Sequence, residues 1–190
     1  MKTMLTLMLT ALLSSAAAQA ENPKVLIETT KGRIIVELYP DKAPMSVENF
    51  MTYVDDGFFT DTVFHRVIPG FMIQGGGFTE DLAKKPTNDA IANEADNGLR
   101  NKRGTIAMAR TTEPHSATAQ FYINLVDNSA LDHTSKDIRG WGYAVFGQVV
   151  VGMDVVDAIG AVQTWTVGRM PNVPVEPVVI KGTRLVEAAE

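Results

Sequence analysis

The sequence predicts a mainly β fold, built as either a closed antiparallel barrel or a sandwich. Short β-rich runs recur along the chain, and only two stretches have helical spacing. So few helices argue against alternating β-α-β units. Short strands separated by turn residues are typical of all-β barrels and sandwiches, and the pattern alone does not choose between the two. The expected strands are 25–30, 33–38, 62–67, 71–74, 105–109, 120–124, 144–149, 177–180 and 183–186.

The first two runs form a predicted hairpin, because Lys31-Gly32 between them has the character of a tight turn. Pro44 and Ser46 then suit the first turn of a helix. Apolar residues recur at helical spacing after them, and Gly57 is the expected stop. These apolar residues are Val47, Phe50, Met51 and Val54.

A second helix is expected over residues 153–159, with Gly160 at its end. The polar stretch 79–103 contains no convincing periodic pattern, so we expect a long surface loop there. We find no internal repeat and no low-complexity linker. A chain of 190 residues with this organisation favours one domain.

The N-terminus has the pattern of a cleaved signal peptide over residues 1–20. Lys2 gives a positive start, an apolar run follows, and Ala18 and Ala20 are small residues where a signal peptidase reads the chain. A membrane anchor and a buried helix are the alternatives, but the run is short for a helix that spans a bilayer. We therefore expect a mature domain of residues 21–190, exported and without stable membrane insertion.

Composition excludes several classes of function. A net charge of −5 gives no basic surface, so nucleic acid is not an expected partner. The chain has no cysteine and therefore no disulfide, thiolate nucleophile or thiolate metal site. The three histidines lack the spacing of metal ligands, and Asp132-His133 lacks the nucleophile elbow of a hydrolase. No metal is expected.

Residues 64–77, Phe-His-Arg-Val-Ile-Pro-Gly-Phe-Met-Ile-Gln-Gly-Gly-Gly, are the most informative stretch. They place a permanent cation, Arg66, near an apolar pair, Phe71-Met72, and an uncharged hydrogen-bonding residue, Gln74. Such a surface suits a neutral, partly apolar substrate with one carbonyl group. The three glycines lack the strand–glycine–helix context of a phosphate site, so they favour close backbone packing or a turn.

This stretch resembles the signature of the cyclophilins, the peptidyl-prolyl cis-trans isomerases. The resemblance implies a closed eight-stranded barrel with a helix over each end. It also implies that Arg66 is the catalytic donor to the prolyl amide, a role that an arginine on a strand would not otherwise suggest. Phe71 and Met72 would line the proline pocket, although neighbours on a strand point to opposite faces. Gln74 would bind the substrate backbone or orient Arg66.

Two further segments extend the resemblance, which covers about residues 24–186. In 104–110 and 119–123, Ala109, Arg110 and Gln120 would lie along the substrate backbone. Arg110 replaces an asparagine frequent in eukaryotic members, and its contact is expected to use the main chain. Tyr122 stands in place of a pocket phenylalanine, with its hydroxyl expected at the rim, and Phe121 is expected in the core.

In 128–133 and 142–147, Leu131 matches a pocket leucine, and Tyr143 stands where many members have histidine. Ala130 stands where many members have a large aromatic residue, so weak cyclosporin binding is expected. Trp141 lies nearby and is a candidate for replacing part of that surface.

The sequence as a whole looks like a periplasmic cyclophilin of the bacterial exported branch. The expected reaction is X–Pro isomerisation in unfolded or extended proline-containing polypeptides during the folding of exported proteins. No cofactor is implied, and a monomer is expected. Two alternatives stay open: a non-catalytic proline-binding chaperone module that uses the same groove, and an exported scaffold whose pocket is incidental.

Overall fold

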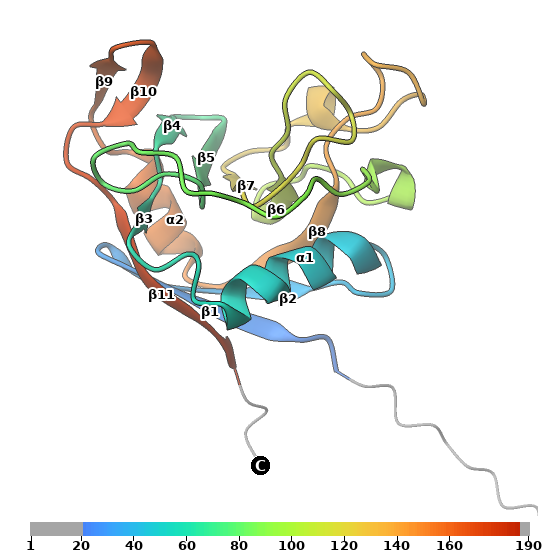
Figure 1. Ribbon diagram of the computed structural model, residues 1–190, viewed down its shortest axis with the longest axis horizontal. Helices are drawn as coiled ribbons and strands as arrows, with labels where there is room; N and C mark the ends of the chain where they lie inside the picture. The colour runs from blue at the N-terminus through green and yellow to red at the C-terminus, as the bar shows by residue number, and fades with distance from the viewer. Residues whose placement is uncertain (1–20, 187–190) are drawn as a thin grey trace, which may run out of the picture.

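A strongly curled antiparallel sheet of nine strands forms the body of the computed structural model, which describes residues 21–186 (Figure 1). A separate two-stranded hairpin and two helices pack against this sheet, so the expected mainly β fold with two helices is confirmed. The sheet strands are β1 (Lys24–Thr29), β2 (Gly32–Leu38), β3 (Thr62–Val63), β4 (Arg66–Ile68), β5 (Met72–Gly75), β6 (Thr105–Met108), β7 (Phe121–Asn124), β8 (Val145–Val151) and β11 (Val179–Val186).

The curled sheet returns upon itself. Its strand order is β3-β11-β1-β2-β8-β6-β7-β5-β4, so its two edge strands are β3 and β4, which only Phe64 and His65 separate along the chain. The Val63 N–H also donates to the Phe78 carbonyl at 2.9 Å, just beyond the end of β5. If β3 and β4 are counted as one interrupted strand, the nine strands become the expected eight.

The hairpin of β1 and β2 and the first helix form close to where the sequence places them. Thr29 pairs with Gly32, so the turn is Thr30-Lys31, one residue earlier than expected. Helix α1 (Pro44–Asp55) starts at the expected proline, and no side chain at its N-cap position caps it. Glu94 does this instead, because its carboxylate accepts hydrogen bonds from the Met45 and Ser46 N–H groups at 3.0 and 2.8 Å.

The C-terminal third differs from the sequence expectation in two ways. One continuous strand, β11, replaces the two strands expected at 177–180 and 183–186. After helix α2 (Met153–Gly160) the chain also forms an unexpected hairpin of β9 (Thr164–Val167) and β10 (Met170–Pro174). In Figure 1 this hairpin projects beside β4, and β10 packs against β4.

The interior of the curled sheet is filled with apolar side chains. Phe50 of α1 lies among Phe59, Phe121 and Phe146, with ring centroids 5.2–5.6 Å apart. All four rings are buried, which confirms the core assignment of Phe121. Aromatic residues carry much of the energy of such a core because each removes a large apolar area from water.

The loop 79–103 has no strand, as expected, apart from short isolated bridges, and carries one short 3-10 helix (Ala95–Asn97). It is not purely a surface segment, because Asn93, Glu94 and Asn101 are buried and bonded to other parts of the chain. No helix within residues 21–186 is long and apolar enough to cross a membrane. The predicted signal peptide lies outside the described residues.

Candidate active site

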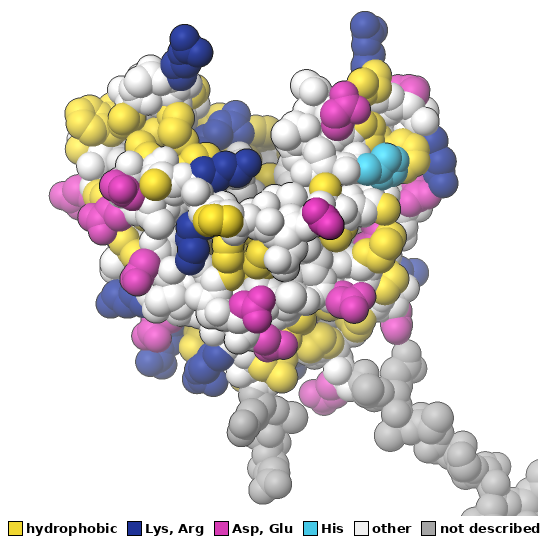
Figure 2. Space-filling model, in the orientation of Figure 1, with side chains coloured by type: hydrophobic (Ala, Val, Ile, Leu, Met, Phe, Trp, Pro, Cys, Tyr) yellow, Lys and Arg dark blue, Asp and Glu magenta, His cyan; other side chains and the backbone are white. Residues whose placement is uncertain are grey.

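A pocket of about 210 Å³ opens on the outer face of β4, β5 and β7. Nine of the ten residues predicted from the sequence line it together. Figure 2 shows a hollow in the surface between the β9–β10 hairpin and the loops opposite, with Lys and Arg side chains beside it. The lining residues are Arg66, Phe71, Met72, Gln74, Ala109, Arg110, Tyr122, Leu131 and Tyr143.

The tenth predicted residue, Gln120, joins the site through a hydrogen-bonded chain. Arg66 and Gln74 are directly opposite on β4 and β5, and the Arg66 Nη1 donates to Gln74 Oε1 at 3.3 Å. Gln74 Nε2 in turn donates to Gln120 Oε1 at 2.9 Å. This chain orients the half-buried guanidinium without any carboxylate, so the positive charge of Arg66 is not neutralised by an ion pair within the described residues.

The glycine run behind Gln74 makes room for this chain. A Cβ atom on Gly77 would lie 2.4 Å from the Cγ of Gln120. One on Gly76, whose φ is +78°, would lie 2.8 Å from the Phe121 ring. The close-packing interpretation of the three glycines is therefore confirmed, and their bare backbone lets Gln120 reach Gln74.

Phe71 and Met72 both reach the pocket although they are adjacent in sequence. Phe71 belongs to the turn before β5, and β5 begins at Met72, so the strict alternation of a strand does not yet apply to Phe71. Met72 is buried and Phe71 is half-buried over the same outer apolar cluster. Leu131 and Tyr143 complete that cluster from the far wall.

The hydroxyl of Tyr122 does not lie at the rim, which corrects the sequence expectation. Tyr122 is buried, and its hydroxyl donates to Asn101 Oδ1 at 2.6 Å. Burial, followed by the nearby Tyr143 and Asp132, holds the pKa of Tyr122 well above its usual value. A buried phenol needs a hydrogen-bond partner, so the hydroxyl turns toward the interior and leaves the ring to form the pocket floor.

Asn101 was not among the predicted site residues, yet it connects the floor and the far wall of the pocket. Its Nδ2 donates to the Leu131 carbonyl at 3.1 Å, and its backbone N–H donates to Asp132 Oδ1 at 2.7 Å. The only sequence signal for it is a polar residue in a long polar loop, which carries no information about burial.

The side chain of Arg110 is bonded within the protein, so the prediction that it meets the substrate through its main chain stays a prediction. Its Nε donates to the Gly142 carbonyl at 2.8 Å, its Nη1 to the Thr111 carbonyl at 2.9 Å, and its guanidinium lies 4.5 Å from the centroid of the Tyr143 ring. These contacts hold Tyr143 against the pocket, where the rings of Tyr143 and Tyr122 meet edge to face. Arg110 therefore forms a fixed wall.

Trp141 is not among the residues that line the pocket. Its ring packs between His115 and His133, and its Nε1 donates to the Asn93 carbonyl at 3.3 Å. Ala130 itself is exposed. Weak cyclosporin binding stays a prediction, and an inhibition titration checks it.

The described residues contain no group of three or more His, Cys, Asp or Glu side chains placed to hold a metal ion.

The nearest histidine to the pocket in sequence is His65. Burial, aided by the charge of Arg66, lowers its pKa to about 4, so it is neutral at pH 7.

The fold and this outer-face pocket define a class of protein, and the comparisons place the chain in it. The family model described as cyclophilin type peptidyl-prolyl cis-trans isomerase/CLD matches residues 24–185. The chain belongs to the cyclophilin family, and it is an enzyme of the peptidyl-prolyl cis-trans isomerase class.

Bacterial relatives with this activity in their names are similar over most of their length. Peptidyl-prolyl cis-trans isomerase A of Dickeya dadantii is 54% identical over 92% of this chain and 90% of its own. Peptidyl-prolyl cis-trans isomerase cyp18 of Streptomyces antibioticus is 57% identical, over 85% and 97% of the two chains. Peptidyl-prolyl cis-trans isomerase B of Escherichia coli is 52% identical, over 86% and 99%.

A solved structure shows the same fold at lower sequence similarity. The Cryptosporidium parvum cyclophilin type peptidyl-prolyl cis-trans isomerase, crystallised in the presence of the dipeptide Ala-Pro, matches with a TM-score of 0.70. It is 22% identical and covers 87% of this chain and 99% of its own.

Proposed function

We propose that the pocket binds an extended X–Pro segment and that Arg66 lowers the rotation barrier by donating a hydrogen bond to the prolyl nitrogen. Resonance gives the peptide bond a barrier of about 18–20 kcal/mol. A donor to the nitrogen lone pair weakens that resonance and stabilises the twisted transition state. No bond forms or breaks, so the reaction requires neither a nucleophile nor a base.

The observation that carries this proposal is the state of the two guanidinium groups at the pocket. The Arg110 side chain donates hydrogen bonds to the carbonyl groups of Gly142, Thr111 and Thr112. Arg66 makes one side-chain hydrogen bond within the described residues, to Gln74, and its remaining N–H groups are free to meet a substrate. A fixed charged donor at the site of reaction needs little reorganisation during turnover.

The apolar part of the pocket suits the pyrrolidine ring. Met72 and the Tyr122 ring form its floor, and Phe71 and Leu131 form its sides. Gln120, with its carbonyl oxygen already bonded to Gln74, has its amide N–H groups left for a substrate carbonyl. The presence of Ala-Pro in the crystals of the Cryptosporidium parvum relative fits such a ligand.

We further propose that the substrates are unfolded or extended proline-containing segments of exported proteins, in the periplasm. The support is the signal-peptide pattern of residues 1–20. Cell fractionation, with the mass of the purified protein, tests this: a product that begins at Glu21 in the periplasmic fraction is expected. A cytoplasmic protein that keeps Met1 would contradict it.

Cis-to-trans exchange of a short X–Pro peptide tests the mechanism. We expect Arg66→Ala to lower kcat/KM by about 10²–10³-fold, the effect typical of losing one oriented donor at the reacting group. Arg33→Ala is the matched control, since Arg33 is also a strand arginine but its side chain is 73% exposed and away from the pocket. It should stay within about twofold of the wild type, as an exposed surface change does.

Two outcomes would contradict the mechanism. An Arg66→Ala variant that turns over at the wild-type rate would remove Arg66 from the reaction. A correctly folded wild type that binds the peptide without accelerating exchange would favour the proline-binding chaperone module.

A further inference from the structure

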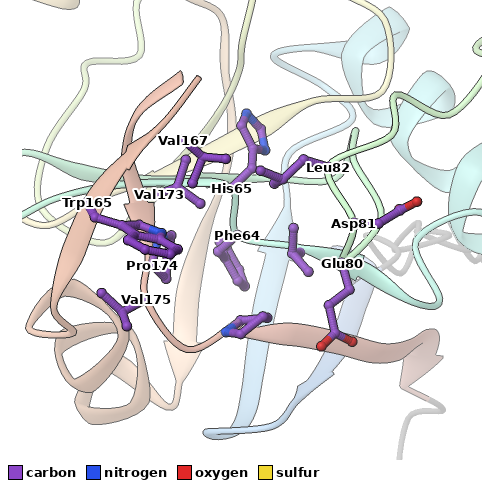
Figure 3. Close-up of a pocket in the computed structure, with 12 residues that line it drawn as sticks. Phe64, His65, Glu80, Asp81, Leu82, Trp165, Val167, Val173, Pro174 and Val175 are labelled. Carbon is purple, nitrogen blue, oxygen red and sulfur yellow. The ribbon is translucent and has the colours of Figure 1, made fainter. Parts of the chain in front are cut away.

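A second cavity, of about 230 Å³, lies on the other side of β4 from the candidate active site, between the β9–β10 hairpin and residues 80–82 (Figure 3). Its floor is apolar, formed by Phe64, Val173 and Pro174, all of them buried. In Figure 3, Trp165 and Val175 lie on the hairpin side, and Leu82 lies opposite. The mechanism proposed above uses none of these residues.

The hairpin side of the cavity exposes unusually large apolar side chains. Trp165 is 56% exposed and Val175 is 46% exposed. Figure 2 shows hydrophobic side chains gathered over β9 and β10 on this part of the surface. An exposed aromatic residue beside a concave apolar surface is the usual anchor of a protein or peptide contact.

The opposite side is held in a strained conformation. Leu82 has φ +62°, in the left-handed region that a leucine rarely adopts. Two backbone hydrogen bonds hold this turn, from Leu82 N–H to the Thr79 carbonyl at 2.9 Å and from Thr79 N–H to the Ala83 carbonyl at 3.0 Å. The turn places the Leu82 side chain in the cavity wall, and such strain tends to persist where a ligand surface needs it.

His65 contributes a buried imidazole ring to the cavity wall. The side chain is 5% exposed, and its Nδ1 has less than 1 Å² of accessible surface. A ligand in the cavity would therefore pack against the ring and would not reach this nitrogen. A neutral imidazole beside apolar walls suits an uncharged group.

The rim of the cavity is acidic. Glu80 and Asp81 line it, and both are exposed. Asp81 accepts a hydrogen bond from Thr79, whereas Glu80 makes no ion pair within residues 21–186. A ligand with a basic residue next to its apolar group would therefore be complementary to this rim.

The two cavities are neighbours along the chain. His65 lines the second cavity and Arg66 lines the active site, and consecutive Cα atoms are about 3.8 Å apart. The β10 strand that forms the second cavity also packs on β4, which carries Arg66. Because neighbouring side chains of an extended segment point to opposite faces, the two cavities open on opposite sides of β4, and a polypeptide must pass around this wall to occupy both. A chain of 20 residues, up to about 66 Å long when extended, is the kind of ligand that can do so.

We propose that this cavity is a second binding site for the polypeptide substrate, which takes an apolar side chain flanked by Lys or Arg from the same chain whose proline is at Arg66. The identity of the ligand rests on the proposed function. The site would favour long unfolded chains over short proline peptides, because only a long chain reaches both cavities. Occupying two linked sites raises affinity without changing the reaction at either one.

Fluorine NMR of protein labelled with 5-fluorotryptophan tests binding without relying on catalysis. The chain has two tryptophans, Trp141 and Trp165, so two resonances are expected, assigned with Trp165→Phe. The probe is a 20-residue peptide with one Ala-Pro and a distant Lys-Leu-Lys segment. It should shift the Trp165 resonance and bind about tenfold more tightly than a matched peptide with Glu-Ser-Glu, a difference of about 1.4 kcal/mol.

Turnover of short and long peptides tests the consequence. Trp165→Ala should leave exchange of a tetrapeptide unchanged and lower kcat/KM for the 20-residue probe by about tenfold, and Glu80→Gln should lower it by about threefold. Ile138→Ala is the control, since Ile138 is 57% exposed and lines neither cavity, and it should change neither rate.

Three results would overturn the proposal. The first is a Trp165 resonance that does not shift when the peptide is added. The second is a Trp165→Ala variant that lowers kcat/KM for both substrates equally. The third is a Trp165 resonance that shifts with protein concentration alone, which would assign the surface to self-association. Failure of the catalytic proposal is a separate result. A wild type that accelerates exchange of neither peptide but binds the long probe at Trp165 would contradict the mechanism at Arg66 and still support the second binding site.

Discussion

Phe121 and Tyr122 are neighbours on β7, yet they belong to two different environments. Phe121 points into the curled sheet, where it meets Phe50 and Phe59 in a purely apolar core. Tyr122 points outward, where its ring forms the pocket floor and its hydroxyl enters a buried network of amide side chains. One strand therefore separates the residues that stabilise the fold from those that shape the site.

The difference shows how precision is obtained on the outer face. Apolar packing inside has no required hydrogen-bond geometry, whereas the outer network fixes donors and acceptors in place. Asn101 accepts from Tyr122 and Asn124, and Asn124 also receives a bond from Asn128 at 2.7 Å. Directional bonds of this kind hold a pocket wall in one arrangement, which a catalytic site needs.

The largest effect on stability is expected from the inner face. Phe121→Ala should lower the free energy of unfolding by about 3–5 kcal/mol, because it leaves a cavity among the aromatic rings. Urea denaturation measures this loss. An equal loss of stability from the outer-face substitution Asn101→Ala, described below, would contradict the distinction between the two faces.

A pH-dependent effect on stability, of intermediate size, is expected from His65, which directly precedes β4. Its pKa of about 4 in the folded protein is below the ordinary value of 6.5, so the unfolded chain binds the proton more readily. The corresponding stability is fully present above pH 6.5 and is lost as the pH falls toward 4, up to about 3 kcal/mol.

Urea denaturation at pH 7.5 and pH 4.5 checks this, with His65→Leu as the comparison. The variant should lose less stability than the wild type on acidification. Equal losses in the two proteins would show that His65 titrates normally in the fold.

A smaller effect on stability, joined to an effect on activity, is expected from the outer face. Asn101→Ala removes the acceptor of the Tyr122 hydroxyl and of one Asn124 N–H, while Asn124 keeps its bond to Thr105. The unsatisfied donors should cost about 1–3 kcal/mol. The substitution should also raise KM for a proline peptide, because the Leu131 wall loses its bond to Asn101.

A double-mutant cycle with Tyr122→Phe sharpens this prediction. Removing the hydroxyl removes the unsatisfied donor, so Tyr122→Phe should cost less stability in the Asn101→Ala background than in the wild type. Strictly additive losses would mean that the two side chains do not depend on each other.

Local sequence patterns predicted most of the fold and placed the candidate site residues. The apolar spacing of Val47, Phe50 and Val54 specified α1. With the help of the family resemblance, the sequence also named nine residues that line one pocket, four of them within the run from Arg66 to Gln74. The sequence patterns did not predict contacts between residues far apart in the chain. Asn101 and Glu94 act on partners far away in sequence, and no local pattern distinguishes them from exposed loop residues.

The hairpin of β9 and β10 was missed for a different reason. Its strands are short, and their residues are mostly half-buried or exposed, so they lack the alternation of buried and exposed residues that signals a strand. Gly168 at its tip, with φ +57°, was the one available signal of a tight turn.

The interruption at Phe64 and His65 has a further consequence under the proposal that the substrates are unfolded chains. An unfolded client carries many unsatisfied backbone groups and can add itself as an extra strand to any long open edge of a sheet. Here the two edge strands have only two and three residues, and the Val63 N–H is already bonded to Phe78. Within residues 21–186, the nine-stranded sheet therefore presents no long open edge to which an unfolded chain could add a strand.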